Sequence, residues 1–137
     1  NEADAYFIGL VHDIGRIVVF NCLTEVTGKS FRSLMPCSRE FKTLMTELSM
    51  EIGYLIAKAW QLPLIYQNAL LQQRMRKRDA LGQLLYRANR LSERYILWHK
   101  QALMLEDYQA LQQELAIDEQ VFAKFNEIAG DIAAEIQ

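Results

Sequence analysis

The sequence predicts an all-α helical bundle, and two observations carry that prediction. Apolar residues recur at spacings of three and four through most of the 137 residues, and no run shows the alternation typical of a half-buried strand. The apolar fraction is 51% and the net charge is −2, a balance typical of a chain that buries a core. Its length suits one unit, so we expect about five to seven helices in a single domain over residues 1–137.

The first half of the chain is expected to hold three helices. Residues 4–23 carry apolar side chains on every face, which predicts one central, buried helix. The weaker pattern over residues 24–36 predicts a connection. We expect Ser38 to cap the next helix, whose apolar positions are Phe41, Leu44, Met45, Leu48, Ile52, Leu55, Ile56 and Ala59. Residues 60–63 (Trp-Gln-Leu-Pro) end this helix, and Pro63 is expected in the first turn of a helix that contains Ile65, Ala69 and Leu70.

The second half of the chain is expected to hold further amphipathic helices. We expect Asp79 to cap a helix whose inward positions are Leu81, Leu84, Leu85, Ala88, Leu91 and Tyr95. A break at residues 116–118 separates the tail into two parts. The last part is a final helix with an apolar stripe formed by Val121, Phe125, Ile128, Ile132 and Ile136.

Composition argues against several classes of protein. A net charge of −2 gives no general attraction to nucleic acid or to an anionic membrane. No run reaches the ~18 uninterrupted apolar residues that a spanning helix needs. The start of the chain carries Glu2 and Asp4, so we expect no secretory signal, and the missing initial methionine suggests a fragment. Cys22 and Cys37 lack the spacing of a metal site, so we interpret them as reduced packing thiols of a cytoplasmic protein.

The most specific motif is the octapeptide at residues 9–16, Gly-Leu-Val-His-Asp-Ile-Gly-Arg. Burying His12 beside Asp13 costs free energy unless both side chains are compensated. A divalent metal would compensate both, and so would a structural hydrogen-bonded pair, which the dipeptide alone favours. Gly15 would let another element approach closely, and Arg16 would place positive charge beside a phosphate oxygen.

This octapeptide resembles the signature helix of the HD superfamily, and three later blocks resemble its HDOD branch. These blocks are residues 51–53 (Glu-Ile-Gly), 60–63 (Trp-Gln-Leu-Pro) and 88–91 (Ala-Asn-Arg-Leu), and their order and spacing agree with that family. The resemblance covers roughly residues 5–94, without the helices that normally precede the signature. It implies an HD-domain-like bundle in which this chain forms the C-terminal main portion of the family domain.

The resemblance also implies where metal ligands would stand. Active HD hydrolases gather histidines and aspartates around one or two metals, and His12 and Asp13 match the signature pair. Where metal-keeping relatives have further histidines, this chain has Ser49 (followed by Met50) and the neighbouring amides Gln72 and Gln73. The last ligand, an aspartate, is replaced by Asn89.

These replacements predict a vestigial site without metal or other cofactor. Its members are His12, Asp13, Arg16, Ser49, Gln72, Gln73 and Asn89. Disturbing even a partner of a ligand typically costs about 10- to 100-fold in metal affinity. Losing three ligands should therefore remove useful affinity, and with it the hydroxide nucleophile that a metal supplies at neutral pH. The other histidine, His99, is interpreted as a helix-surface residue.

A basic stretch at residues 74–78 is the second candidate site. Its cations are Arg74, Arg76, Lys77 and Arg78, which could receive the phosphates of a nucleotide or RNA, or an acidic partner protein. A solvated helix end would have the same composition. The stretch lacks interleaved aromatic residues, which argues against single-stranded nucleic acid. The aromatic residues Tyr66, Tyr95, Trp98 and Tyr108 either complete the core or face a partner helix, and the core is favoured.

We therefore expect a non-catalytic signal-transduction output or scaffold domain of the bacterial type that acts through protein contacts. Self-association and a small nucleotide ligand are compatible with this hypothesis, whereas a membrane is not expected. One alternative is a metal-dependent phosphohydrolase that completes its site with residues outside this chain. Another is a nucleotide- or nucleic-acid-binding regulator that uses Arg16 and the basic stretch.

Overall fold

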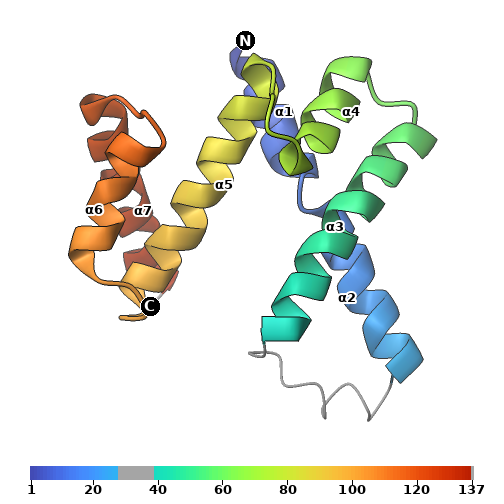
Figure 1. The fold of residues 1–137 in the computed structure, drawn as a ribbon, viewed down its shortest axis with the longest axis horizontal. Helices are drawn as coiled ribbons and strands as arrows, with labels where there is room; N and C mark the ends of the chain where they lie inside the picture. Colours follow the sequence, from blue (N-terminus) through green and yellow to red (C-terminus); the bar gives the residue numbers. More distant parts are fainter. Residues whose placement is uncertain (28–38, 137) are drawn as a thin grey trace. The chain divides into compact units, whose positions relative to one another are not determined.

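The computed structural model describes residues 1–27 and 39–136, and within them the chain is helical with no strand. The all-α prediction is confirmed, with a number of helices inside the predicted range. In chain order the elements are α1 (Glu2–Val11), α2 (Ile14–Thr27), α3 (Arg39–Ala59), α4 (Leu64–Leu71), the 3-10 helix η2 (Gln72–Arg74), α5 (Ala80–His99), α6 (Leu105–Glu114) and α7 (Glu119–Ile136) (Figure 1).

The chain forms two compact units, Asn1–Tyr86 and Arg87–Gln137, and α5 runs from one into the other. The first unit contains α1 to α4, η2 and the start of α5. The second contains the rest of α5 with α6 and α7. Each unit has its own packed side chains and is described by itself. The single domain expected from the sequence stays a prediction.

The first 27 residues form two helices, so the predicted single helix over 4–23 is wrong. The break falls at His12 and Asp13, between α1 and α2. In a continuous helix the Gly9 carbonyl would accept the amide of Asp13. Here the His12 side chain takes that carbonyl, with Nδ1 2.6 Å from Gly9 O. The helix then restarts with Asp13 O accepting the amides of Arg16 and Ile17.

The second helix is longer than the sequence pattern indicated. It continues to Thr27, so the first four residues of the predicted connection over 24–36 are helical. The remainder of that connection, with Cys37 and the predicted cap Ser38, lies outside the described residues.

The missing side chain of Gly15 allows the close approach of α2 and α3, which run side by side in Figure 1, with Gly53 opposite it. A Cβ atom on Gly15 would overlap the Ser49 carbonyl oxygen and lie 2.6 Å from the Gly53 amide nitrogen. Both glycines are buried. The prediction that Gly15 permits close approach of another element is confirmed, and the element is α3.

The core of the first unit consists of small and aliphatic side chains from α1, α3, α4 and α5. Its buried members are Ile8, Ala57, Ala69, Leu70 and Leu85, with Val11, Leu62, Tyr66 and Leu81 packed around them. Far apart in sequence, α1 and α4 are further tied by a hydrogen bond of 2.6 Å from the Tyr66 hydroxyl to Asp4 Oδ1. That hydrogen bond, rather than burial, is the main cause that raises the pKa of Tyr66.

The expected all-round burial of the first segment is also wrong. Leu10 and Ile17 are each 61% exposed, and Cys22 is an exposed thiol rather than a packing one. The physical reason is that α3 and α4 cover only part of the surface of α1 and α2. Apolar composition alone predicts a buried helix only when neighbours surround it.

The segment Glu2–Cys22 has the length and composition of a membrane-crossing helix, which is a weak indication because core helices of globular proteins share them. Two features of the segment favour a packed helix pair over a span. The helix is interrupted at His12 and Asp13 in its middle. Gly15 lies against the backbone of α3.

Helix ends follow a common pattern. At the end of α3 the amide of Leu62 bonds to Ala57 O and that of Gln61 bonds to Lys58 O, with Gln61 in the left-handed region at φ 56°. This is a Schellman motif, which satisfies carbonyls that the helix end would leave unpaired. The ends of α5 and α6 repeat it at Gln101 (φ 62°) and Ala116 (φ 53°). The predicted break at 116–118 is therefore confirmed.

Helix starts agree with the sequence at α5 and differ at α4. Asp79 Oδ1 accepts the amide of Gly82 at 2.9 Å, so the predicted cap of α5 is confirmed. Pro63 lies one residue before α4, at its N-cap, rather than in its first turn. Its fixed φ of about −65° suits this extended position as well as the first helical one.

The second unit is built around aromatic rings. Tyr108 is 2% exposed, and its ring centroid lies 5.0 Å from that of Trp98 and 5.5 Å from that of Phe122. Tyr95 contacts Tyr108 and Phe125, each at 5.9 Å between centroids. The Tyr108 hydroxyl donates to Asn126 Oδ1. The preferred interpretation of Tyr95, Trp98 and Tyr108 as core residues is supported by these contacts.

Burial of Tyr108 predicts that the second unit weakens at alkaline pH. Burial is the main cause that raises the pKa of its hydroxyl from 10.0 to about 12, with a smaller contribution from Tyr95. Because the folded pKa exceeds the unfolded one, the stabilisation is complete below pH 10 and is lost as the pH rises towards 12. Thermal unfolding measured from about pH 8 to about pH 11 should show that the Tm falls as the pH rises. The Tyr108→Phe variant should lack the part of this fall that comes from Tyr108.

Candidate functional site

His12 lies at the corner between α1 and α2, and its ring orientation is fixed by the backbone. Its Nδ1 lies 2.6 Å from Gly9 O. A carbonyl oxygen can only accept, so Nδ1 carries the hydrogen and donates it. The other ring nitrogen, Nε2, lies 3.5 Å from Asp13 Oδ2. This is the tautomer that metal-binding histidines commonly use, with one nitrogen donating to a carbonyl and the other free to bind.

Asp13 is a solvent-facing member of the pair. Its side chain is 55% exposed, whereas that of His12 is 21% exposed. The desolvation cost that an adjacent buried imidazole and carboxylate would carry is therefore small here. In place of the hydrogen-bonded pair favoured by the dipeptide, the two side chains make a contact of 3.5 Å, which is an ion pair only when the imidazole is charged. The backbone bond of His12 is the shorter and stronger contact.

Ser49 lies on α3 at its contact with α2. Its backbone carbonyl faces Gly15, and on the same helix Gly53 lies near the His12 carbonyl. The serine side chain is 8% exposed, and its hydroxyl oxygen has no hydrogen-bond partner in the described part of the chain. Ser49 therefore lies beside Gly15 of the octapeptide through its backbone, and its place in a vestigial metal site stays a prediction.

Gln72 and Gln73 are occupied in joining the end of α4 to the start of α5. The Gln72 amide donates to Asp79 Oδ2 at 3.2 Å and accepts from the Asp79 backbone amide at 2.8 Å. The Gln73 amide donates to Ala69 O at 2.7 Å and to Gly82 O at 3.0 Å. Through these hydrogen bonds both glutamine side chains connect the end of α4 to the start of α5.

Arg16 and Asn89 are the remaining predicted members. Arg16 is exposed on α2, one turn after His12. Asn89 lies on the part of α5 that belongs to the second unit, where it is partly buried. It is therefore described with that unit and is not assigned to the corner formed by His12, Asp13 and Ser49.

The side chains at this corner do not fit a catalytic metal. Within residues 1–27 and 39–136 no three histidine, cysteine, aspartate or glutamate side chains gather closely enough to hold an ion. A catalytic zinc ion typically takes three protein ligands, and serine is a poor substitute for imidazole or carboxylate. His12 and Asp13 supply two donors, and Ser49 supplies a neutral hydroxyl.

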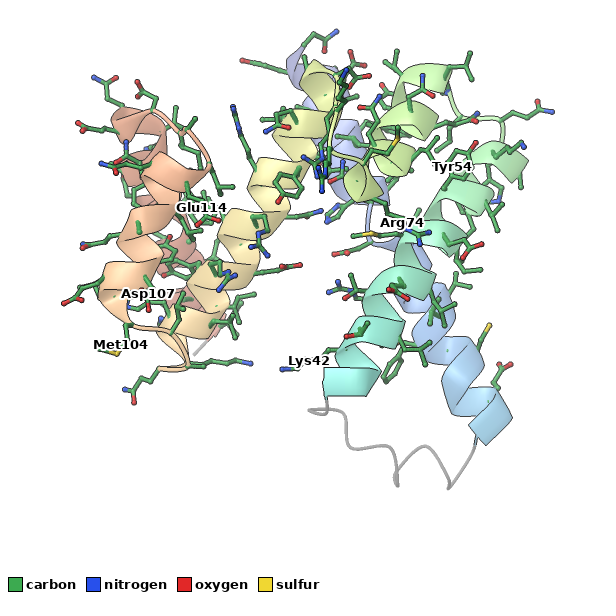
Figure 2. The ribbon with its side chains drawn as sticks, viewed as in Figure 1. Lys42, Tyr54, Arg74, Met104, Asp107 and Glu114 are labelled. Atoms are coloured by element: carbon green, nitrogen blue, oxygen red, sulfur yellow. The ribbon has the colours of Figure 1, made fainter. Side chains whose placement is uncertain are left out.

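The basic stretch begins at Arg74, the last residue of η2, and divides into two kinds of side chain. Arg74 (labelled in Figure 2), Arg76 and Lys77 are exposed. Arg78 is partly buried, with Nε donating to Gln72 O at 3.1 Å and its guanidinium 3.6 Å from the centre of the Tyr86 ring. Three of the four predicted cations are thus available to an anion, and Arg78 holds the connection to α5.

An open hollow in the first unit was not foreseen from the sequence. It has a volume of about 350 Å³ and is lined by Asn1, Asp4, Ile65, Asp79, Ala80, Leu81 and Leu84. Its two carboxylates are already engaged, Asp4 by the Tyr66 hydroxyl and Asp79 by the Gly82 amide. Asp79 both caps α5 and lines the hollow, and the sequence pattern predicted only the first of these roles.

Comparison with known proteins gives one match. A family model described as the HDOD domain matches residues 1–75, more than half of the 137 residues. No curated protein and no solved structure matches the chain. The matched residues include the signature corner, Ser49 and both glutamines, and they end before α5.

Proposed function

Because the chain belongs to the HDOD family, we propose that it is a non-catalytic signal-transduction output or scaffold domain that acts through protein contacts. The proposal includes a cytoplasmic location and a bacterial type of pathway. The signature corner is then a structural feature of the fold. His12 shapes the turn between two helices, and Gly15 lets α3 approach.

One observation carries this proposal: among residues 1–27 and 39–136, no third histidine, cysteine, aspartate or glutamate side chain gathers with the signature pair, His12 and Asp13. On the neighbouring α3 the Ser49 hydroxyl is buried without a hydrogen-bond partner among the described residues, and Gln73 and Gln72 are bonded to backbone carbonyls and to the cap residue Asp79. Replacing ligands by neutral groups at several positions lowers affinity more than the about 10- to 100-fold loss caused by disturbing one supporting partner. A metal-bound hydroxide is therefore not expected at neutral pH.

The purified chain should contain far less than one equivalent of iron, manganese or zinc. The sample would be stripped with chelator, dialysed against each metal in turn and analysed by elemental mass spectrometry. Hydrolysis of bis(p-nitrophenyl) phosphate would be followed in the same samples and should stay at the background rate. A His12→Ala variant is the matched control, since its residual metal content should equal that of the unaltered chain.

Stoichiometric metal that disappears in His12→Ala, together with phosphodiesterase activity, would contradict the proposal. It would favour the second candidate, a metal-dependent phosphohydrolase, for which the supporting observation is that His12 Nε2 and Asp13 Oδ2, two metal-binding atoms, lie 3.5 Å apart. Such an enzyme would recruit its remaining ligands from outside this chain. Thermal stabilisation of the metal-free sample by nucleotides would instead favour a regulator that uses Arg16 and the exposed cations of the basic stretch.

A further inference from the structure

The last helix, α7, packs into the second unit by one face only. Phe122 lies 5.5 Å from the Tyr108 ring, Phe125 lies 5.9 Å from the Tyr95 ring, and Asn126 accepts the Tyr108 hydroxyl. These three side chains hold the helix to α5 and α6. Yet no residue of α7 is buried, although its sequence is strongly amphipathic.

The apolar side chains that remain form a row along the helix, called here the α7 ridge: Ile128, Ile132 and Ile136. They are 48%, 52% and 81% exposed, and Val121, one heptad before Ile128, is 59% exposed. A spacing of four residues places them one above the other on a single line of the helix surface. Isolated exposed aliphatic residues are common, whereas a continuous row marks a contact surface.

A row of carboxylates borders the α7 ridge. Glu127, Asp131 and Glu135 each directly precede one isoleucine, so the sequence from 127 to 136 repeats an acidic residue, isoleucine and two small residues. All three carboxylates are exposed. Glu127 lies 3.4 Å from Lys124, whereas Asp131 and Glu135 make no ion pair within the described part of the chain.

We propose that the α7 ridge binds an amphipathic helix of a partner protein whose apolar stripe is bordered by lysines or arginines. The isoleucines would bury against that stripe, and the carboxylate row would pair with its cations, fixing orientation. This inference rests on the proposed action through protein contacts and names the surface that makes one.

Charge decides between this partner and other occupants. Nucleic acid and anionic lipid would meet three carboxylates at the contact and be repelled. A second copy of α7 would bring its own carboxylate row, since the helix carries four acidic residues and one lysine. A basic helix is the occupant for which both the apolar row and the charged row are complementary.

The test uses a fluorescein-labelled amphipathic peptide with leucines at heptad spacing and lysines on both borders of its stripe. Fluorescence anisotropy with the full chain should show saturable binding, and a peptide with glutamates in place of the lysines should bind far more weakly. Reversing Asp131→Lys together with Glu135→Lys should weaken binding of the lysine peptide by roughly tenfold or more, because exposed pairs become repulsive. Ile128→Gln with Ile132→Gln should weaken both peptides.

A matched control lies on the neighbouring helix. Asp107→Lys with Glu114→Lys makes the same charge change on exposed positions of α6, which Figure 2 labels, and should leave binding within about twofold. Circular dichroism and Tm would show that each variant is folded.

Equal binding of both peptides, or equal losses in the α6 and α7 variants, would overturn the proposal. So would a dimer, seen by sedimentation, that the α7 changes dissociate while the peptide does not bind. Neither result depends on metal content, so failure here is distinguishable from failure of the non-catalytic proposal.

Discussion

A Gly15→Ala variant is expected to lose about 3 kcal/mol of unfolding free energy, because the added methyl group has no room. It would overlap the Ser49 carbonyl oxygen and lie 2.6 Å from the Gly53 nitrogen. Both obstacles are backbone atoms of α3, so no side chain can rotate away. The two helices would have to separate, and contacts on either side of the glycine pair would be lost. Urea unfolding followed by circular dichroism measures the change.

Gly9→Ala is the matched control for this prediction. Gly9 lies within α1, and a Cβ atom there would meet nothing within 4 Å. Alanine is a better helix former than glycine, so this variant should gain up to about 1 kcal/mol. The two substitutions are chemically identical and lie six residues apart. Equal effects of both on the unfolding midpoint would show that the close approach of α2 and α3 is not important for stability.

The second large effect is expected at Tyr108. Replacing it with alanine should cost about 3–5 kcal/mol, the usual range for removing a buried aromatic ring. Its ring is stacked on Trp98 and faces Tyr95 and Phe122, so the cavity would lie at the centre of the second unit. Thermal unfolding followed by near-ultraviolet circular dichroism reports on this aromatic cluster directly.

Two further variants separate the ring from the hydroxyl. Tyr108→Phe keeps the ring contacts and removes the donor to Asn126, which should cost only about 1 kcal/mol. Tyr6→Ala removes a ring that is 72% exposed on α1 and should change stability by less than about 0.5 kcal/mol. If Tyr108→Phe were as damaging as Tyr108→Ala, the hydrogen bond rather than ring packing would hold the unit together.

Much of the fold could be predicted because helices leave a local periodic signal. The helical class, the cap at Asp79 and the break at residues 116–118 all follow from residues adjacent in sequence. The break at His12 could not be predicted in this way. It depends on the His12 side chain bonding to the Gly9 carbonyl in place of the Asp13 amide. The spacing of apolar residues is the same whether or not that hydrogen bond forms.

The exposed fraction of the apolar side chains is the other property that periodicity could not predict. The pattern of residues 4–23 says that many side chains are apolar, but it does not say how many neighbours the folded chain provides. Leu10 and Ile17 are exposed because α3 and α4 contact other faces of α1 and α2. The same limit applies to α7, whose stripe was correctly placed on one helix and is nevertheless largely open to solvent.

The candidate site was predictable to different degrees. Gly15 could be expected to admit another element, but its partner Gly53 follows only from the packing of two helices. Ser49 was singled out through the family resemblance, and the structure shows its backbone carbonyl against Gly15, a contact that periodicity could not predict. The connecting role of Gln72 and Gln73 had no sequence signal, because their bonds depend on how the chain turns between α4 and α5.

The corner at His12 has a consequence for how such sequences are sorted. Its imidazole stabilises a turn of the backbone, so the His-Asp dipeptide has a role in the fold that does not depend on catalysis. A genome survey that counts this dipeptide alone would then count proteins that share this turn, whether or not they catalyse a reaction. A count of catalytic proteins would have to include the residues at the positions of Ser49, Gln72, Gln73 and Asn89, where the family resemblance implies further metal ligands.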